Sequence, residues 1–301
     1  MRGHWRLLTQ VLGWVSFCAL SGAAWGAATP VAPATRPALQ HVPDEPAQAR
    51  AEKMVREVYA KELASHDLNE RRALAQKMMV AAMESGDDTA ARFVLLKEAR
   101  DVAAGAGDAI AARKAIAALA KSYAIDPTKM SLGAVTSAES AASKAEDLAE
   151  VVQVCVNEAE RAIVLDDYRT ATRLIATAES AATKAKNSGL VEKAQEKRRE
   201  LAAIFLEFQV LIKAQEHLKD QPDDAEAAAQ IGRFLCLYKA DWKAGLPLIA
   251  KGAESGLKKL AQDDLAATSD PTRRVAAGDG WWELSASQPW LVRKHLRARA
   301  G

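Results

Sequence analysis

Short turn signals divide the sequence after Ala49 into segments of helix length. The segments are rich in Ala, Leu, Lys and Glu, which favour helices, and they lack the alternating Val, Ile and Thr runs that indicate strands. Because loops this short join antiparallel neighbours, the sequence predicts an all-α fold of helical hairpins. The signals, which contain Gly, Pro, Asn or Asp, are Asp67, Gly86–Asp88, Gly105–Asp108, Asp126–Pro127, Asp166–Asp167, Asn187–Gly189 and Gln221–Asp224.

Two of the expected helices are long. One helical pattern extends from about Gly133 to Leu165, and another from about Leu190 to Lys219. We therefore divide the helical part of the chain into three ranges. These are an N-terminal helical unit, residues 49–127, a long-helix TPR-like region, residues 128–221, and a Trp-containing C-terminal module, residues 222–301.

Two stretches have the residue spacing of tetratricopeptide (TPR) units. In such units small residues let two helices approach closely, and a large residue fills the remaining gap. The spacing predicts an irregular, TPR-like and α-solenoid-like array. The first stretch contains Ala159, Asp166-Asp167-Tyr168, Ala171, Ile175 and Ala178, and the second, looser one contains Gly232, Asp241-Trp242, Gly245, Ile249 and Gly252.

A nine-residue echo lies within this region. The sequence SAESAASKA, residues 137–145, returns as TAESAATKA, residues 177–185. The residues that follow the two copies are mostly different, whereas a true repeat unit would carry its loop along. We interpret the echo as two helices that share an Ala/Ser face for close packing.

The N-terminus has the order of a secretory signal peptide, residues 1–26. Arg2 and Arg6 flank the start of an apolar run that is short for a membrane span. We expect export to the periplasm or the extracellular space, with no membrane span after cleavage; an uncleaved anchor is the alternative. Residues 27–48 contain five prolines and are expected to form a spacer. The residues of the expected cleavage region are Ala24, Gly26 and Ala28.

Charge and cysteine content limit the functional classes. Residues 1–26 contain two of the 41 Lys and Arg and none of the 39 Asp and Glu, so the remaining chain has no net charge. A nucleic-acid partner is therefore not expected. Cys155 and Cys236 each lie among apolar residues, which is typical of buried thiols; a single disulfide between them is the alternative.

No pattern in the sequence predicts catalysis, a cofactor site or a metal site. Gly105-Ala106-Gly107 follows a helical segment, whereas a dinucleotide site requires a preceding strand. The histidines after the signal peptide are scattered, and none has the spacing of a zinc site. We therefore name no catalytic, cofactor-binding or metal-binding residue.

Aromatic residues are concentrated near the C-terminus. We expect Asp241 to cap a helix and Trp242 to be mostly buried against Phe234 and Tyr238. Adjacent helical residues point about 100° apart, so one of the next two tryptophans is expected to be exposed. The basic residues 290–301 are interpreted as a solvated helix end. The candidate structural or interaction residues are Gly232, Phe234, Tyr238, Asp241, Trp242, Gly245, Gly252, Trp281 and Trp282.

Three stretches resemble a family of exported, planctomycete-type, alanine-rich helical proteins. They are TAARFVLLKEARDVAAGAGDAIAARKAIAAL (89–119), PDDAEAAAQIGRFLCLYKADWKAGLPLIAKGAESGLKKLAQDDLA (222–266) and AAGDGWWELSASQ (276–288). The resemblance implies an exported helical region, of a kind that often precedes other extracellular modules, and it implies no activity.

Two functions follow from these observations. The first is an exported, non-catalytic scaffold that binds protein partners in the cell envelope along a helical groove. The alternative is an accessory component or a weak enzyme that acts on envelope polysaccharide, which requires a pocket with convergent polar or carboxylate groups at matched separation. The sequence predicts neither the identity of a partner nor the oligomeric state.

Overall fold

A computed structural model describes residues 39–252, 255–267 and 270–301. The expected signal peptide, with its cleavage region, and most of the expected spacer lie outside these residues. The described residues form fourteen α-helices and one isolated β-bridge, between Gln40 and Tyr123, which confirms the all-α class. In chain order the helices are α1 (Glu45–Val58), α2 (Ala60–Leu63), α3 (Leu68–Glu84), α4 (Thr89–Gly105), α5 (Ala109–Ser122), α6 (Pro127–Ala141), α7 (Ala145–Val164), α8 (Tyr168–Lys184), α9 (Ser188–Asp220), α10 (Ala225–Lys239), α11 (Trp242–Lys251), α12 (Gly256–Ala266), α13 (Pro271–Ser285) and α14 (Trp290–Ala300).

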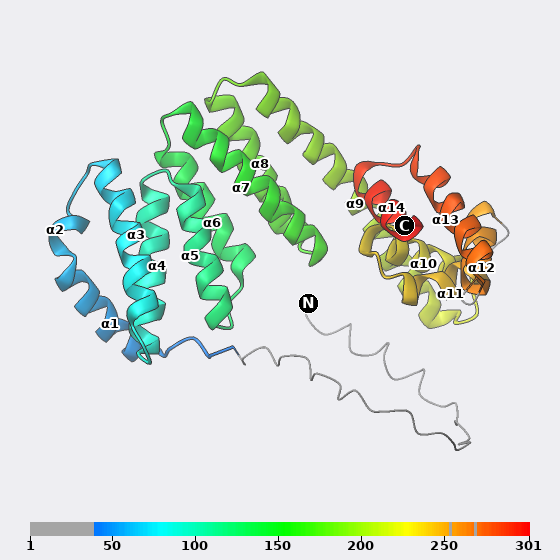
Figure 1. The fold of residues 1–301 in the computed structure, drawn as a ribbon, viewed down its shortest axis with the longest axis horizontal. Coiled ribbons are helices and arrows are strands. Elements are labelled where there is room, and N and C mark those ends of the chain that lie inside the picture. Colours follow the sequence, from blue (N-terminus) through cyan, green and yellow to red (C-terminus); the bar gives the residue numbers. More distant parts are fainter. Residues whose placement is uncertain (1–38, 253–254, 268–269) are drawn as a thin grey trace, which may run out of the picture. The chain divides into compact units, whose positions relative to one another are not determined.

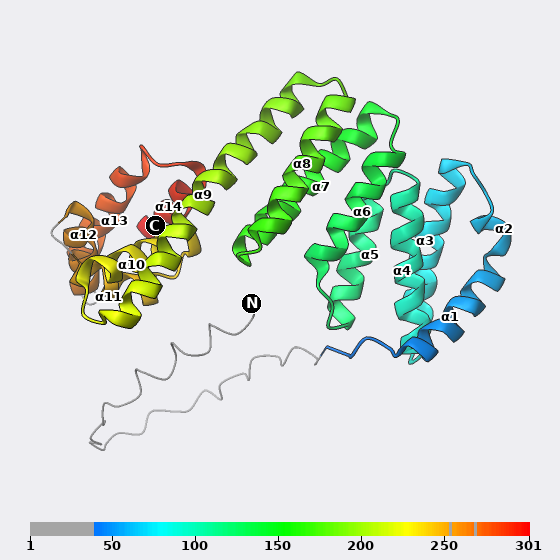
Figure 2. The same cartoon turned by 180° about the vertical axis from the view of Figure 1, so that it is seen from behind.

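Successive helices pack against each other along the chain, as Figures 1 and 2 show from opposite sides. Contacts also skip one helix: α4 touches α6, which touches α8, and α3, α5, α7 and α9 touch in the same way. The helices of residues 68–220 therefore form two layers of alternate helices, as in an α-solenoid. None of the described helices is both long and apolar enough to span a membrane.

Aspartate starts most of the helices. Its carboxylate accepts a hydrogen bond from a backbone N–H in the first turn, which satisfies a donor that the helix itself leaves unpaired. The turn signals of the sequence thus become helix N-caps, and α1 also begins in this way, at Asp44 within the expected spacer. Each of the predicted turn signals contains one N-cap, and these N-caps are Asp67, Asp88, Asp108, Asp126, Asp167, Asn187 and Asp224.

Four interhelical turns share one backbone conformation. A residue one or two positions beyond the end of the helix has a positive φ, and the next residue is the N-cap of the following helix. Glycine adopts this left-handed conformation without cost, whereas other residues are strained in it. The four left-handed residues are Gly107 (φ 73°), Asp166 (58°), Lys186 (53°) and Ala240 (56°).

The prediction of a single long helix from Gly133 to Leu165 is wrong. The chain leaves helical geometry at Ala142, whose ψ is 129°, and resumes it after Lys144, so that α6 and α7 pack against each other. A tertiary contact lies beside the break. Arg72 of α3 donates to Asp147 at the start of α7, at 2.7 Å.

The two copies of the echo contact each other. Ser180 of α8 donates to Glu139 of α6 at 2.8 Å, and the Lys184 ammonium lies 2.7 Å from the same carboxylate. Ala138 and Ala178, which are equivalent positions in the two copies, are both fully buried. The interpretation of a shared small-residue face is therefore confirmed, although the first copy contains the α6–α7 break and the second is helical through Lys184.

Three clusters of buried side chains form the core, one after another along the chain. The first is built from α1 to α6, the second from α5 to α9, and the third from α10 to α14. The 33-residue helix α9 contacts α7 and α8 and also α10, and α14 returns to pack on α10. Residues 39–301 form one compact unit.

Candidate functional site

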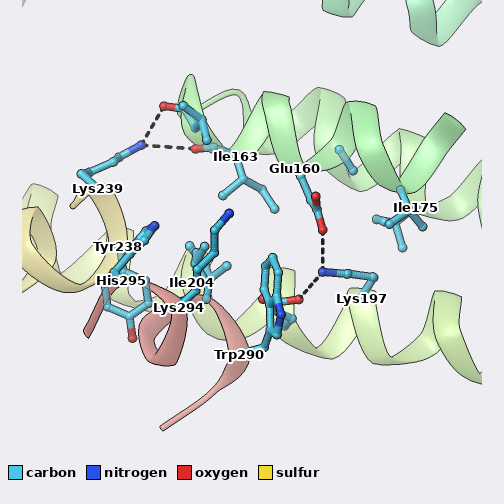
Figure 3. A pocket seen from close by; sticks show the side chains of 15 residues that line it. Glu160, Ile163, Ile175, Lys197, Ile204, Tyr238, Lys239, Trp290, Lys294 and His295 are labelled. Atoms are coloured by element: carbon cyan, nitrogen blue, oxygen red, sulfur yellow. Dashed lines mark hydrogen bonds and ion pairs between the residues drawn. The ribbon is translucent and has the colours of Figure 1, made fainter. Parts of the chain in front are cut away.

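A pocket lies where α14 meets the helices α7 to α10, and Figure 3 shows it from close by. We call it the α7–α14 pocket. It encloses about 140 Å³. Its lining residues, from five helices, are Val156, Ala159, Glu160, Ile163, Val164, Ile175, Lys197, Glu200, Ile204, Tyr238, Lys239, Trp290, Leu291, Lys294 and His295.

The floor of the pocket is apolar. Val156 and Ala159 of α7, Ile175 of α8 and Ile204 of α9 are all buried in the second core cluster. They face inward because they lie on the stripes of their helices that pack against neighbouring helices. The floor therefore offers branched aliphatic surface and no hydrogen-bonding group.

Lys197 bridges two carboxylates at one side of the pocket. Its ammonium lies 2.7 Å from Glu160 of α7 and 2.9 Å from Glu200, one turn further along α9. Burial lowers the pKa of Lys197, but the hydrogen bonds to Glu160 and Glu200 outweigh it, so the pKa lies above its usual value. Lys197 is therefore charged and already has two acidic partners.

The indole of Trp290, at the start of α14, contacts two cations. The Lys197 ammonium lies 4.1 Å from the centre of the ring, and the Lys294 ammonium lies 5.4 Å from it. Both distances are within the range of cation–π interactions. Lys294 makes no ion pair with any residue that the structure describes.

Lys239 and His295 complete the rim, and both are fixed by hydrogen bonds. Lys239 lies 2.6 Å from the Asp166 carboxylate and donates to the carbonyls of Ile163 and Val164 at the end of α7. Nδ1 of His295 lies 2.8 Å from the Leu237 carbonyl, so this nitrogen carries the proton that is donated.

A second hollow, the α3–α5 groove, runs between α3, α4 and α5 and encloses about 650 Å³. Its apolar side chains include Val80 and Met83, which are 50% and 74% exposed. Lys114 and Lys121 lie along it, and neither makes an ion pair with a described residue. Two smaller hollows share Arg113 with the groove and continue it toward α7 and α6. The groove is lined by Gln76, Met79, Val80, Ala82, Met83, Arg92, Leu96, Arg113, Lys114, Ala117, Ala118, Lys121 and Ser122.

The glycines that the sequence singled out lie at the contact between α10 and α11. Gly232 faces Gly245 so closely that a Cβ atom at Gly232 would lie 2.7 Å from the Gly245 carbonyl oxygen. A Cβ atom at Gly252 would overlap the side chain of Ala229. The expectation that Gly245 and Gly252 allow a neighbouring helix to press close is confirmed.

Asp241 caps α11 as expected, by accepting from the Ala244 N–H at 3.1 Å. The expected packing of Trp242 is wrong, however. Its indole is half-buried and meets Trp281 edge-to-face, with ring centres 5.1 Å apart. Trp242 therefore packs against α13, whereas the ring contacts of Phe234 are with Tyr238 and with Phe208 of α9.

Phe234 and Tyr238 instead extend a row of aromatic rings. They stack on each other with centres 5.3 Å apart, and Phe234 also meets Phe208 of α9, which meets Tyr168 of α8. Tyr238 is the one predicted candidate residue that lines the α7–α14 pocket.

The adjacent tryptophans differ in exposure, as expected. Trp281 is 1% exposed and donates from Nε1 to Asp264 at 2.7 Å, whereas Trp282 is 54% exposed. Arg299 of α14 binds the same Asp264 carboxylate at 2.6 Å. The basic C-terminal segment is thus not simply a solvated end, because Val292 and Leu296 of α14 are also buried.

Cys155 and Cys236 are both free and buried, in different core clusters. Burial raises the pKa of each thiol to about 12. The interpretation as buried thiols is confirmed, and the alternative disulfide is not formed.

The comparisons with known proteins leave the function open. No protein-family model, no curated protein and no solved structure matches this chain. The resemblance to exported planctomycete-type proteins therefore stays a prediction. Among the residues that the structure describes, no group of three or more His, Cys, Asp or Glu side chains is placed to hold a metal ion.

Proposed function

We propose that this chain is an exported, non-catalytic helical scaffold that binds a protein partner in the cell envelope. The observation that carries the proposal is the α3–α5 groove, where large apolar side chains of α3 and, beside the groove, of α5 remain exposed. Val80 and Met83 lie in the groove, and Ile110 of α5, which is also exposed, borders the hollow that continues it toward α7. Exposed apolar surface of this kind is typical of interaction sites.

The side chains of the groove suit a polypeptide partner. Methionine is unbranched and adapts its shape to different contacts, which favours binding of a polypeptide surface. Lys114 and Lys121 supply charges that steer and orient a partner without being neutralised within the chain. The export part of the proposal is supported by the signal-peptide pattern of residues 1–26.

The alternative, action on envelope polysaccharide, has less support. It requires carboxylates that are available to a substrate. In the α7–α14 pocket, Glu160 and Glu200 share the ammonium of Lys197, which favours a structural role for both.

Site-specific photo-crosslinking in the native envelope tests the proposal. A benzoylphenylalanine residue is placed at Met83 in the groove or, as the matched control, at Ser137, which is exposed on α6 of the other layer. We expect one protein partner to be crosslinked from Met83 and not from Ser137. Equal crosslinking from both positions, or none from Met83, contradicts the proposal.

A variant that introduces a charge gives a second readout. Met83→Glu places a carboxylate on the apolar surface of the groove and should abolish the crosslink from a neighbouring position, Lys114. Since Met83 is exposed, this substitution should leave the thermal midpoint unchanged. Ser137→Glu is the control and should preserve the crosslink.

A further inference from the structure

We infer that the α7–α14 pocket binds a small monocarboxylate whose apolar part is about the size of a benzene ring. This site is separate from the α3–α5 groove, and the inference does not depend on the proposed function. Three features of the pocket lead to it: the size of the cavity, the chemistry of its floor, and the distribution of charge around its rim.

The size and the floor define the apolar part of the ligand. A cavity of about 140 Å³ is comparable to one that accepts benzene in a protein core, which has a volume of about 150 Å³. Ile175 and Ile204 offer only aliphatic surface to an occupant, and Trp290 and Leu291 add further apolar surface. A polar body would lose its hydration here without gaining a hydrogen bond.

The charge distribution selects a carboxylate. Three lysines line the pocket, but Lys197 is paired with Glu160 and Glu200, and Lys239 is paired with Asp166. Lys294 is the remaining ammonium. Figure 3 shows it directed into the pocket beside Ile163. An anionic group of the ligand at this position would give Lys294 an ion-pair partner, as Lys197 and Lys239 already have.

The same distribution limits the ligand to one negative charge. Glu160 and Glu200 share one ammonium, so the far side of the pocket carries an excess of one carboxylate. A second negative charge on the ligand would face that excess and be repelled. The faces of the Trp290 ring already contact Lys197 and Lys294, so a cationic ligand gains little from the indole.

Isothermal titration calorimetry of the full chain with 3-phenylpropionate tests the inference. We expect saturable binding with a Kd on the order of 1 mM, which is typical of a ligand with this number of atoms. Uncharged 3-phenylpropanamide and cationic 3-phenylpropylamine should bind more weakly. No saturable binding of 3-phenylpropionate, or equal binding of the amide, overturns the inference.

A lysine variant locates the site. Lys294→Met should weaken 3-phenylpropionate about fivefold, the effect of one partly exposed ion pair, and should leave the binding of the amide unchanged. The matched control is Lys213→Met, which removes an exposed lysine of α9 outside the pocket and should bind as the unmodified chain does. Unchanged affinity in Lys294→Met overturns the inference, whatever the outcome of crosslinking at Met83.

Discussion

Gly232 and Gly245 pack backbone to backbone where α10 meets α11, so neither position has room for a methyl group. A Cβ atom at either residue would lie 2.7 Å from the carbonyl oxygen of the other, and one at Gly245 would also overlap the sulfur of Cys236. The contact is between rigid backbones, so it cannot relax through the movement of a flexible side chain. Glycine is therefore required at both positions.

Gly245→Ala should destabilise the protein, because the added methyl group forces α10 and α11 apart. We expect a loss of about 1–3 kcal/mol in the free energy of unfolding, measured by chemical denaturation. The control is Gly133→Ala, since a Cβ atom at this α6 position meets nothing within 4 Å. That substitution should stabilise the protein by about 1 kcal/mol through helix propensity. Equal effects of the two substitutions would contradict the account.

Lys186→Gly should stabilise the turn between α8 and α9. Lys186 is exposed and has a φ of 53°, a conformation that strains every residue with a Cβ atom. Its replacement by glycine should raise the free energy of unfolding by about 1 kcal/mol. Lys186→Ala, which removes the charge but keeps the Cβ atom, should give no such gain; if it does, the strain argument fails.

The three tryptophans of α11 and α13 should differ in their contribution to stability. We expect Trp281→Ala to cost about 3–5 kcal/mol, because it empties a buried site and leaves Asp264 without one of its donors. Half-buried Trp242→Ala should cost about 2 kcal/mol, and exposed Trp282→Ala less than about 0.5 kcal/mol. Denaturant titrations of the three variants measure this order, and a larger cost at Trp282 than at Trp281 would refute the packing described here.

Glu139 should make the stability depend on pH. Burial raises the pKa of this carboxyl, but the hydrogen bonds from Lys184 and Ser180 outweigh it, so the folded-state pKa lies below the ordinary 4.5. A depressed folded-state pKa means that the carboxylate stabilises the fold above about pH 4.5. This contribution is lost as the pH falls below that value and through the folded-state pKa.

The measurement compares Glu139→Gln with the unmodified chain over this pH range. At pH 7 the substitution should cost about 1–2 kcal/mol, the value of a hydrogen bond to a charged group. The difference should shrink steadily below pH 4.5. Lys184→Met should show the same trend, because it removes the charged partner. A cost that does not change with pH would show that the ion pair is not its source.

The buried thiols should be unreactive in the folded protein. With a pKa of about 12, Cys155 and Cys236 are protonated at pH 8, and the protonated thiol is a poor nucleophile. The chain has one further cysteine, Cys18, which a Cys18→Ser variant removes. In this variant, a thiol-specific chromogenic disulfide should label neither Cys155 nor Cys236 before unfolding and both in denaturant. Rapid labelling of the folded variant would contradict the burial of both side chains.

Helix starts could be predicted from the sequence because they depend on local chemistry. The N-caps Asp108 and Asp167 depend only on local contacts, because each carboxylate accepts a hydrogen bond from a backbone N–H three residues ahead. The break after Ala141 has no such local signal, because Ala, Ser and Lys all tolerate a helix. A contact beside the break joins Asp147 to Arg72, which is 75 residues away in the sequence.

The pocket could not be predicted either, because residues far apart in the sequence form it. Lys197, Lys239 and Lys294 come from three helices, and no spacing in the sequence links them. The signal that was available was Trp290 followed one turn later by Lys294, within a segment that was interpreted as a solvated end. Likewise, the proximity of Trp242 to Phe234 and Tyr238 in sequence suggested a contact, whereas its partner, Trp281, lies on a different helix.

Helix α9 constrains which changes of chain length this protein can accept. One inserted residue near its middle would turn everything after it by about 100° and advance it by about 1.5 Å. Lys239 would then leave Asp166, and Trp290 would leave Lys197. Seven inserted residues would restore the direction but displace α10 to α14 by about 10 Å. The contacts that Lys239 and Trp290 make with residues that precede the middle of α9 therefore constrain the number of residues in this helix.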